Sequence, residues 1–241
     1  MGELSVSDYN ALVEEIVAAV RPRPKAVGSL AAAIESTLLA PDATAAQIEA
    51  LCDHAAAAGM AAVCVAPVWV ALAAERLRAT SVLVVTVIGF PLGASLGSVK
   101  LYDAAECLKL GADELDVVIN LGALKSGNDA RVQGELAAVT ALARAAGGRV
   151  KAILEMGLLS PGELERACAA ALAAGVDFVK NGTGTGRGDA TPEGIARLRT
   201  LVGTRTRIKA AGGIRTAAQA RALLAAGADR LGTSAARALL S

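Results

Sequence analysis

Along this chain, alanine-rich segments with apolar residues at helical spacing alternate with short, mostly β-branched apolar runs. The clearest repeats, at residues 110–113, 174–177 and 226–229, end a helical segment with a glycine and place an acidic residue before the next apolar run. Glycine adopts the left-handed conformation that commonly ends a helix. The repeated unit therefore predicts helices that alternate with the strands of a parallel sheet.

Eight apolar runs have the length expected of strands, near residues 31–36, 61–66, 82–89, 114–119, 150–155, 177–181, 207–211 and 229–232. Eight parallel strands with helices between them indicate an α/β protein with a single (β/α)8, or TIM, barrel. Hydroxyl side chains at the expected helix starts can cap the first exposed amides, at Thr44, Ser98, Ser160, Thr191 and Thr216.

A further helix is expected over residues 5–20, before the first strand, and the alternating Arg-Pro sequence at 21–24 would end it. No linker-like segment follows it. We therefore predict one domain over residues 1–241, with an amino-terminal helix and extension at 1–24 and the barrel at 30–240. A hydrophobic content of 54% with only 2% aromatic residues fits the aliphatic core of such a barrel.

Charge and cysteine content narrow the classes of partner. The formal net charge is +1 and like charges do not form long runs, which argues against nucleic acid and membrane surfaces as partners. Apolar runs are broken before the roughly 20 residues of a membrane helix, and acidic residues interrupt residues 1–20, unlike an export signal. Four cysteines without CxxC spacing and a single histidine predict reduced thiols, no metal site and a cytoplasmic protein.

Two lysines stand at the ends of neighbouring predicted strands, where parallel barrels bind their ligands. Lys180 ends the sixth strand before a glycine-rich loop, and Lys209 lies near the end of the seventh. Strands lie roughly 4.8 Å apart, so the two ammonium groups repel and the less solvated one loses its proton first. Which lysine this is stays open. A neutral amine can attack a carbonyl to form a Schiff base; the alternative is that Lys180 extends to solvent.

The fourth predicted strand carries a carboxylate toward the same end. Period-two alternation places Glu114, Asp116 and Val118 on one face, opposite an apolar face. A buried Asp116 requires a partner, so it is either a structural counter-ion of a lysine or an acid/base that relays protons to one. The presence of two nearby lysines favours the acid/base role.

Glycines after the last two strands indicate a phosphate site. Gly212 and Gly213 follow the seventh strand, and Gly232 and Ser234 lie at the end of the eighth; each loop leads into a helix whose first amides are expected to be unpaired. Many barrels hold phosphate at this position. A tight turn alone would also account for paired glycines.

These residues, together with the segments 86–93, 118–127 and 155–159, resemble deoxyribose-phosphate aldolase, a class I aldolase, over about Ile34 to Leu240. The resemblance implies that Lys180 forms the Schiff base, Lys209 lowers its pKa and Asp116 relays protons. The implied reaction is reversible cleavage of 2-deoxyribose 5-phosphate to glyceraldehyde 3-phosphate and acetaldehyde, through a lysine-bound enamine. This lyase activity needs no metal or other cofactor and belongs to deoxyribonucleotide catabolism.

The resemblance also assigns residues to the substrate pocket, Thr37, Cys64 and Thr183, and to the phosphate, Gly184, Gly212, Gly213, Gly232 and Ser234. Cys64 is alternatively a small core residue, and the two threonines alternatively satisfy loop backbone. The sequence departs from the family pattern at Glu35, Ser36, Ala40, Ala66, Asn181 and Gly182. These changes alter the pocket walls, so a different aldehyde substrate and a non-catalytic sugar-phosphate-binding barrel remain alternatives. Apolar faces on the outer helices permit a homodimer.

Overall fold

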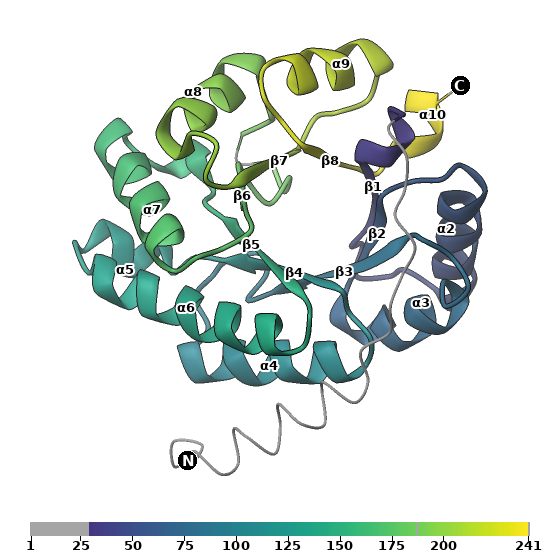
Figure 1. The fold of residues 1–241 in the computed structure, drawn as a ribbon, viewed down its shortest axis with the longest axis horizontal. Coiled ribbons are helices and arrows are strands. Elements are labelled where there is room, and N and C mark those ends of the chain that lie inside the picture. The colour runs from purple at the N-terminus through teal and green to yellow at the C-terminus, as the bar shows by residue number, and fades with distance from the viewer. Residues whose placement is uncertain (1–28, 187, 241) are drawn as a thin grey trace.

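The computed structural model describes residues 29–186 and 188–240, and these form a closed barrel of eight parallel strands (Figure 1). Each strand pairs with the next in chain order, and the eighth pairs with the first. The strands are β1 (Ile34–Leu38), β2 (Ala62–Val65), β3 (Leu83–Ile88), β4 (Glu114–Val118), β5 (Arg149–Ile153), β6 (Phe178–Lys180), β7 (Arg207–Ala211) and β8 (Arg230–Thr233). The predicted barrel is confirmed. The first strand begins later than expected, because residues 31–33 form a short 3-10 helix, η1 (Ala31–Ala33).

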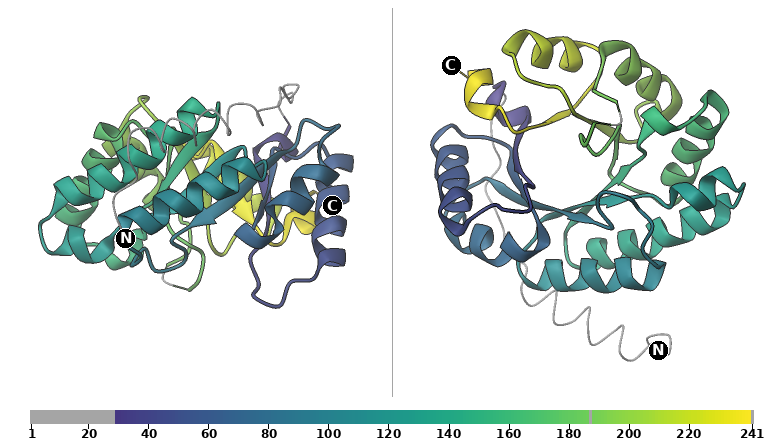
Figure 2. Two further views of the ribbon diagram at one scale, coloured as in Figure 1. Left: turned by 90° about the horizontal axis from the view of Figure 1, so that it is seen from below. Right: turned by 180° about the vertical axis from the view of Figure 1, so that it is seen from behind.

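Helices surround the strands as an outer ring, and views from opposite ends of the barrel show the same arrangement (Figures 1 and 2). The α-helices are α2 (Ala45–Ala57), α3 (Val70–Arg76), α4 (Gly97–Lys109), α5 (Leu121–Lys125), α6 (Asp129–Ala145), α7 (Pro161–Ala173), α8 (Pro192–Val202), α9 (Ala217–Ala225) and α10 (Ala236–Leu240). Two more 3-10 helices are η2 (Pro67–Trp69) and η3 (Met156–Leu158).

Four of the five predicted helix caps are confirmed. The side chains of Thr44, Ser160, Thr191 and Thr216 each accept a hydrogen bond from the backbone amide three residues later. The prediction for Ser98 is wrong, because α4 begins at Gly97, so Ser98 lies within its first turn and the N-cap residue is Leu96, without a side-chain cap. The predicted helix at residues 5–20 lies outside the described residues.

Alternation along the strands divides the side chains between the barrel interior and the layer beneath the helices. On β4, Leu115 and Val117 pack into the large core cluster, whereas Glu114 and Asp116 are fully buried among charged partners inside the barrel. A second, smaller apolar cluster is built on β2 and β3, from Ala62, Cys64, Val85 and Val87 with Leu39, Leu83 and Phe90 packed against it. One side of the interior is thus aliphatic and the other is charged.

The carboxyl end of β4 is braced from outside the barrel. Lys100 of α4 is buried, and its Nζ donates to the backbone oxygen of Val118 at 3.0 Å and to Glu135 at 2.9 Å. The loop before α4 approaches the same strand so closely that a Cβ on Gly93 would lie 2.0 Å from the Ile119 oxygen. Only glycine fits there, and Gly93 also has a positive φ of 68°. These contacts fix the strand that carries Asp116.

In the described part of the chain, no helix combines the length and the apolar character that crossing a membrane requires.

Candidate active site

Three lysines project into the charged side of the barrel, and each is almost completely buried. Lys180 on β6 and Lys209 on β7 are register partners, as are Asp116 on β4 and Lys151 on β5. The exposed fraction is 3% for Lys180 and 0% for Lys151 and Lys209. Burying an ammonium group is costly unless it is paired with an anion or loses its proton.

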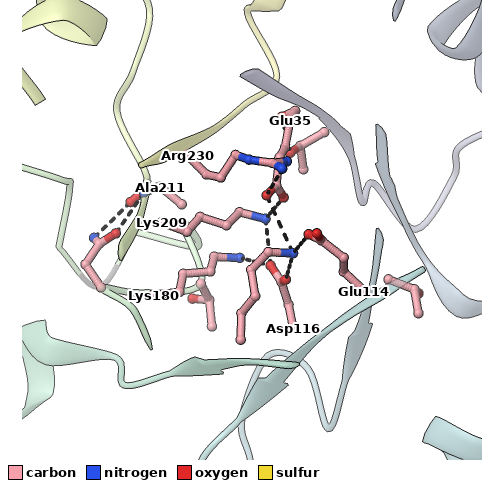
Figure 3. A network of polar contacts seen from close by, with 12 residues as sticks. Glu35, Glu114, Asp116, Lys180, Lys209, Ala211 and Arg230 are labelled. Carbon is pink, nitrogen blue, oxygen red and sulfur yellow. Dashed lines mark hydrogen bonds and ion pairs between the residues drawn. The ribbon is translucent and has the colours of Figure 1, made fainter. Parts of the chain in front are cut away.

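Asp116 lies at the centre of the three lysines. Its Oδ2 accepts hydrogen bonds from Nζ of Lys180 at 3.1 Å and of Lys209 at 2.7 Å (Figure 3). Its Oδ1 accepts one from Nζ of Lys151 at 2.9 Å. Burial alone would raise the pKa of Asp116, but the three cations hold it well below its usual range. The predicted juxtaposition of Asp116 with Lys180 and Lys209 is present, and Asp116 is an anion at neutral pH.

The two lysines on β6 and β7 differ in their counter-ions. Lys209 has a second carboxylate partner, because Glu35 reaches its Nζ from β1 (Figure 3). Burial would lower the pKa of Lys209, but Asp116 and Glu35 raise it above its usual value. For Lys180, burial and the adjacent Lys209 both lower the pKa, and Asp116 opposes them only in part. Lys180 is therefore the lysine that loses its proton first, a choice the sequence left open.

Lys151 is the member of this network that sequence reasoning missed. It contacts Glu114 at 2.6 Å and Glu35 at 3.5 Å, in addition to Asp116. The sequence does contain a pattern that indicates it: Lys151 lies between the apolar Val150 and Ala152 on a strand, so alternation places its side chain in the barrel interior.

Arginines add positive charge at the amino-terminal ends of the strands. Arg149 contacts Glu114 at 2.9 Å, and Arg230 lies 3.8 Å from Glu35. Burial raises the pKa of Glu114, but Lys151, Arg149 and Arg230 outweigh it and lower the pKa to about 2. Arg207 stacks on the buried Phe178 ring with its guanidinium carbon 3.9 Å from the ring centroid. These side chains fill the amino-terminal layer of the barrel, so Lys180 faces the carboxyl-terminal layer.

Two of the predicted pocket residues have partners within the protein. The Thr37 hydroxyl donates to the backbone oxygen of Glu35 at 3.0 Å. The Thr183 hydroxyl donates to the buried Glu155 at 2.5 Å, and its amide donates to the same carboxylate. Glu155 itself has a positive φ of 51° and is a further residue that the prediction of site residues missed. The roles of Thr37 and Thr183 toward substrate stay predictions.

Cys64 faces the barrel interior from β2, in register with Thr37. It belongs to the aliphatic side of the interior and is fully buried. Burial raises the pKa of its thiol. Cys64 therefore presents a small apolar surface toward the charged side, and any contact with substrate stays a prediction.

The loops after β7 and β8 were predicted to lead into helices with unpaired first amides, and the structure differs from this prediction. The first turn of α9 is not free, because Thr216 and Gln219 form a capping box, and α10 has only five residues. The prediction of unpaired first amides is therefore wrong for α9. A Cβ on Gly232 would lie 2.9 Å from Cε of Lys209, so this glycine makes room for the lysine side chain.

Asn181, one of the departures from the family pattern, connects the ends of β6 and β7. Its side chain donates to the Ala211 oxygen at 2.9 Å and accepts from the Ala211 amide at 2.7 Å. This paired contact holds the loop that follows Lys180 against the strand that carries Lys209.

The arrangement can support carbonyl chemistry through an amine. A buried lysine with a lowered pKa lies against a carboxylate whose pKa is lowered and beside a second lysine whose pKa is raised. The amine can add to an aldehyde, and the carboxylate can accept and return protons at the new bond. Within the described ranges, no three histidine, cysteine or acidic side chains are placed to hold a metal ion.

Comparison with known proteins agrees with this chemistry. Residues 30–241 match the sequence model of the DeoC/LacD family of aldolases. A deoxyribose-phosphate aldolase of Geobacillus sp. (strain WCH70) is 48% identical over 206 residues, which is 86% of this chain and 92% of that protein. One from Thermococcus gammatolerans is 48% identical over 203 residues, 83% of this chain and 90% of that protein.

A solved structure of the deoxyribose-phosphate aldolase from Aeropyrum pernix, described as a tetramer, superposes with a TM-score of 0.83 at 33% identity. The superposition covers 98% of this chain and 97% of that one. A match over nearly the whole barrel, including the strands that bring a deprotonatable lysine to a carboxylate, shows that this chain belongs to the DeoC/LacD family of aldolases.

Proposed function

We propose that this aldolase reversibly cleaves 2-deoxyribose 5-phosphate to glyceraldehyde 3-phosphate and acetaldehyde through a Schiff base on Lys180. The observation that carries the proposal is the asymmetry of the two neighbouring lysines: Lys180 has a lowered pKa and Lys209 a raised one, beside a shared carboxylate. The substrate is taken from relatives that carry the name deoxyribose-phosphate aldolase at 44–48% identity.

In the cleavage direction, the neutral Nζ of Lys180 adds to the aldehyde carbon of the open-chain sugar, and loss of water together with uptake of one proton gives a protonated imine. The C2–C3 bond of the sugar then breaks. Its electron pair passes into the imine to form an enamine, while the C3 hydroxyl loses its proton as that carbon becomes the aldehyde of glyceraldehyde 3-phosphate. Protonation of the enamine carbon and hydrolysis release acetaldehyde.

Asp116 is the group placed to move these protons. It is within hydrogen-bond distance of Lys180 and Lys209, so it can exchange a proton with the group bound at Lys180 inside the buried site. Lys209 stays protonated and keeps Lys180 available as the neutral amine. Both roles rest on the same contacts.

Borohydride trapping tests the Schiff base directly. The protein is incubated with acetaldehyde, reduced with borohydride, digested and mapped by mass spectrometry, with a sample reduced without aldehyde as the control. We expect a stable ethyl adduct on Lys180, because its amine is neutral more often than those of Lys151 and Lys209. An active preparation that gives no lysine adduct would exclude this mechanism.

Replacing Lys209 with leucine is expected to move the pH–rate profile toward alkaline pH. Removing the neighbouring cation raises the pKa of Lys180, so less of it is neutral at pH 7; a shift of about two pH units lowers turnover there about 100-fold. The measurement is kcat for cleavage between about pH 6 and pH 10. Lys125→Met, which removes an exposed lysine that is paired with Glu163 outside the barrel interior, is the control and should leave the midpoint in place. An unmoved midpoint in Lys209→Leu would show that Lys209 does not tune Lys180.

We further propose that this protein is a cytoplasmic enzyme, that it acts on small phosphorylated sugars or aldehydes, and that it assembles as a homodimer. The cytoplasmic assignment is supported by four cysteines that are all free and buried. The dimer is supported by exposed apolar side chains along α4 and the loop before it, at Leu92, Leu96, Val99 and Tyr102. Light scattering of the purified protein tests the subunit number.

A further inference from the structure

The loop between β6 and α8 lies directly on the glycine turn that follows β7. The amide of Ala190 donates to the Gly212 oxygen at 3.1 Å. A Cβ on Gly184, at the start of the same loop, would lie 3.6 Å from the Cα of Gly212. The turn to which the family resemblance assigns the substrate phosphate is thus in contact with another loop.

This contact brings a carboxylate to the turn. A Cβ on Gly213 would lie 2.5 Å from Cγ and 2.6 Å from Oδ2 of Asp189, and a Cβ on Gly212 would lie 3.5 Å from its Oδ1. Gly212 and Gly213 have φ values of 99° and 72°. The Asp189 side chain therefore occupies the space that the missing side chain of Gly213 leaves, while the residue itself remains exposed to solvent.

A carboxylate at this position changes what the turn can bind. A phosphate monoester is close to a dianion at neutral pH, so Asp189 repels it at the backbone amides that would otherwise attract it. An uncharged hydroxyl group meets no such repulsion and can donate a hydrogen bond to the carboxylate. On the β7 side of the turn, the nearest cation in sequence is Arg215, two residues after Gly213, whose backbone amide donates to Gln219. Arg187, two residues before Asp189, lies outside the described residues.

We propose that Asp189 is a specificity-determining residue, which weakens the preference of this aldolase for phosphorylated over unphosphorylated aldehydes at the Gly212–Gly213 turn. The inference rests on the proposed function, because it assumes that the phosphate end of the substrate reaches this turn. It concerns a residue that the expected phosphate contacts did not include. The substrate class that it adds is the unphosphorylated 2-deoxy sugar.

The test compares kcat/KM for 2-deoxyribose 5-phosphate with kcat/KM for 2-deoxyribose, in the native protein and in Asp189→Asn, which keeps the side-chain shape. Asp42→Asn is the matched control, because Asp42 is an exposed aspartate on the β1–α2 loop. We expect the ratio of the two kcat/KM values, phosphorylated over unphosphorylated substrate, to rise about tenfold in Asp189→Asn at low ionic strength. In Asp42→Asn this ratio should stay constant. An unchanged ratio in Asp189→Asn, with both substrates cleaved, overturns the inference and leaves the proposed function standing.

Binding of inorganic phosphate gives a readout that does not depend on turnover. Titration of the 15N-labelled protein, followed at the amides of Gly212 and Gly213, should show about tenfold tighter phosphate binding in Asp189→Asn than in the native protein. If neither sugar is cleaved but phosphate binding tightens in this way, the proposed function fails and the effect of Asp189 on the turn is retained. If phosphate does not bind more tightly at these amides, the inference is wrong.

Discussion

Replacing Asp116 with asparagine is expected to lower turnover about 1,000-fold, within the range attributed to a positioned acid/base. Asparagine keeps the size of the side chain but carries no charge and cannot take a proton from the reacting group. It also removes the anion between Lys180 and Lys209, which lie 3.1 Å and 2.7 Å from the same oxygen. The loss should fall on proton transfer rather than on imine formation.

Deuterium exchange separates the two steps. Conversion of the acetaldehyde imine to the enamine removes a methyl proton, so NMR in deuterated water reports enamine formation, while borohydride trapping reports the imine. We expect Asp116→Asn to retain an adduct on Lys180 and to exchange methyl protons about 1,000-fold more slowly.

Glu114→Gln is the control for the Asp116 experiment, because Glu114 is equally buried and also contacts Lys151. Its carboxylate has no described contact with Lys180 or Lys209, so methyl exchange should slow far less than in Asp116→Asn. Equal losses in the two variants would mean that general charge balance, and not proton relay by Asp116, accounts for the effect.

The core of the site follows from the sequence because it depends on short-range rules. Period-two alternation fixes which side chains face inward, and chain order fixes which strands are neighbours in a parallel barrel. Those two rules bring Lys180 and Lys209 together as register partners, as the structure confirms. They say less about contacts across the barrel. Glu35 on β1 reaches both Lys209 and Lys151, a contact that depends on the barrel diameter and on the length of the side chain.

Loop contacts were harder to predict, since they depend on packing that no local pattern encodes. The sequence identified Thr183 and the glycine pair at 212–213 as site residues. It did not show that Glu155 would contact Thr183 or that Asp189 would lie against the glycine pair. Each partner comes from a different loop, more than 20 residues away along the chain. The error at Ser98 is of another kind: a hydroxyl side chain near a helix start can cap it only from the N-cap position, and that position is held by Leu96.

Replacing Lys151 with methionine is expected to destabilise the fold by about 4 kcal/mol at neutral pH, as for other buried ion pairs that lose one partner. Methionine preserves most of the side-chain volume, so the loss is electrostatic: Asp116 and Glu114 keep their negative charges but lose the cation at 2.9 Å and 2.6 Å. Turnover should fall as well, because Oδ1 of Asp116 is no longer held in place.

The pH dependence identifies the cause of this destabilisation. In the native protein the pKa of Glu114 is lowered to about 2, so it contributes stability above its unfolded pKa of about 4.3, and this is lost as the pH falls through about 2. Without Lys151 the pKa values of Glu114 and Asp116 rise. Protonation then neutralises the unpaired carboxylates, and the stability difference between variant and native protein should shrink as the pH is lowered.

Urea unfolding at about pH 7.5 and about pH 5 measures this difference. Lys125→Met, which removes an exposed partner of Glu163, serves as the control and should change stability little at either pH. A loss for Lys151→Met that is equally large at both pH values would assign the effect to packing around the side chain rather than to buried charge. A loss that shrinks at the lower pH would show that Lys151 holds the anions on which Lys180 and Lys209 depend.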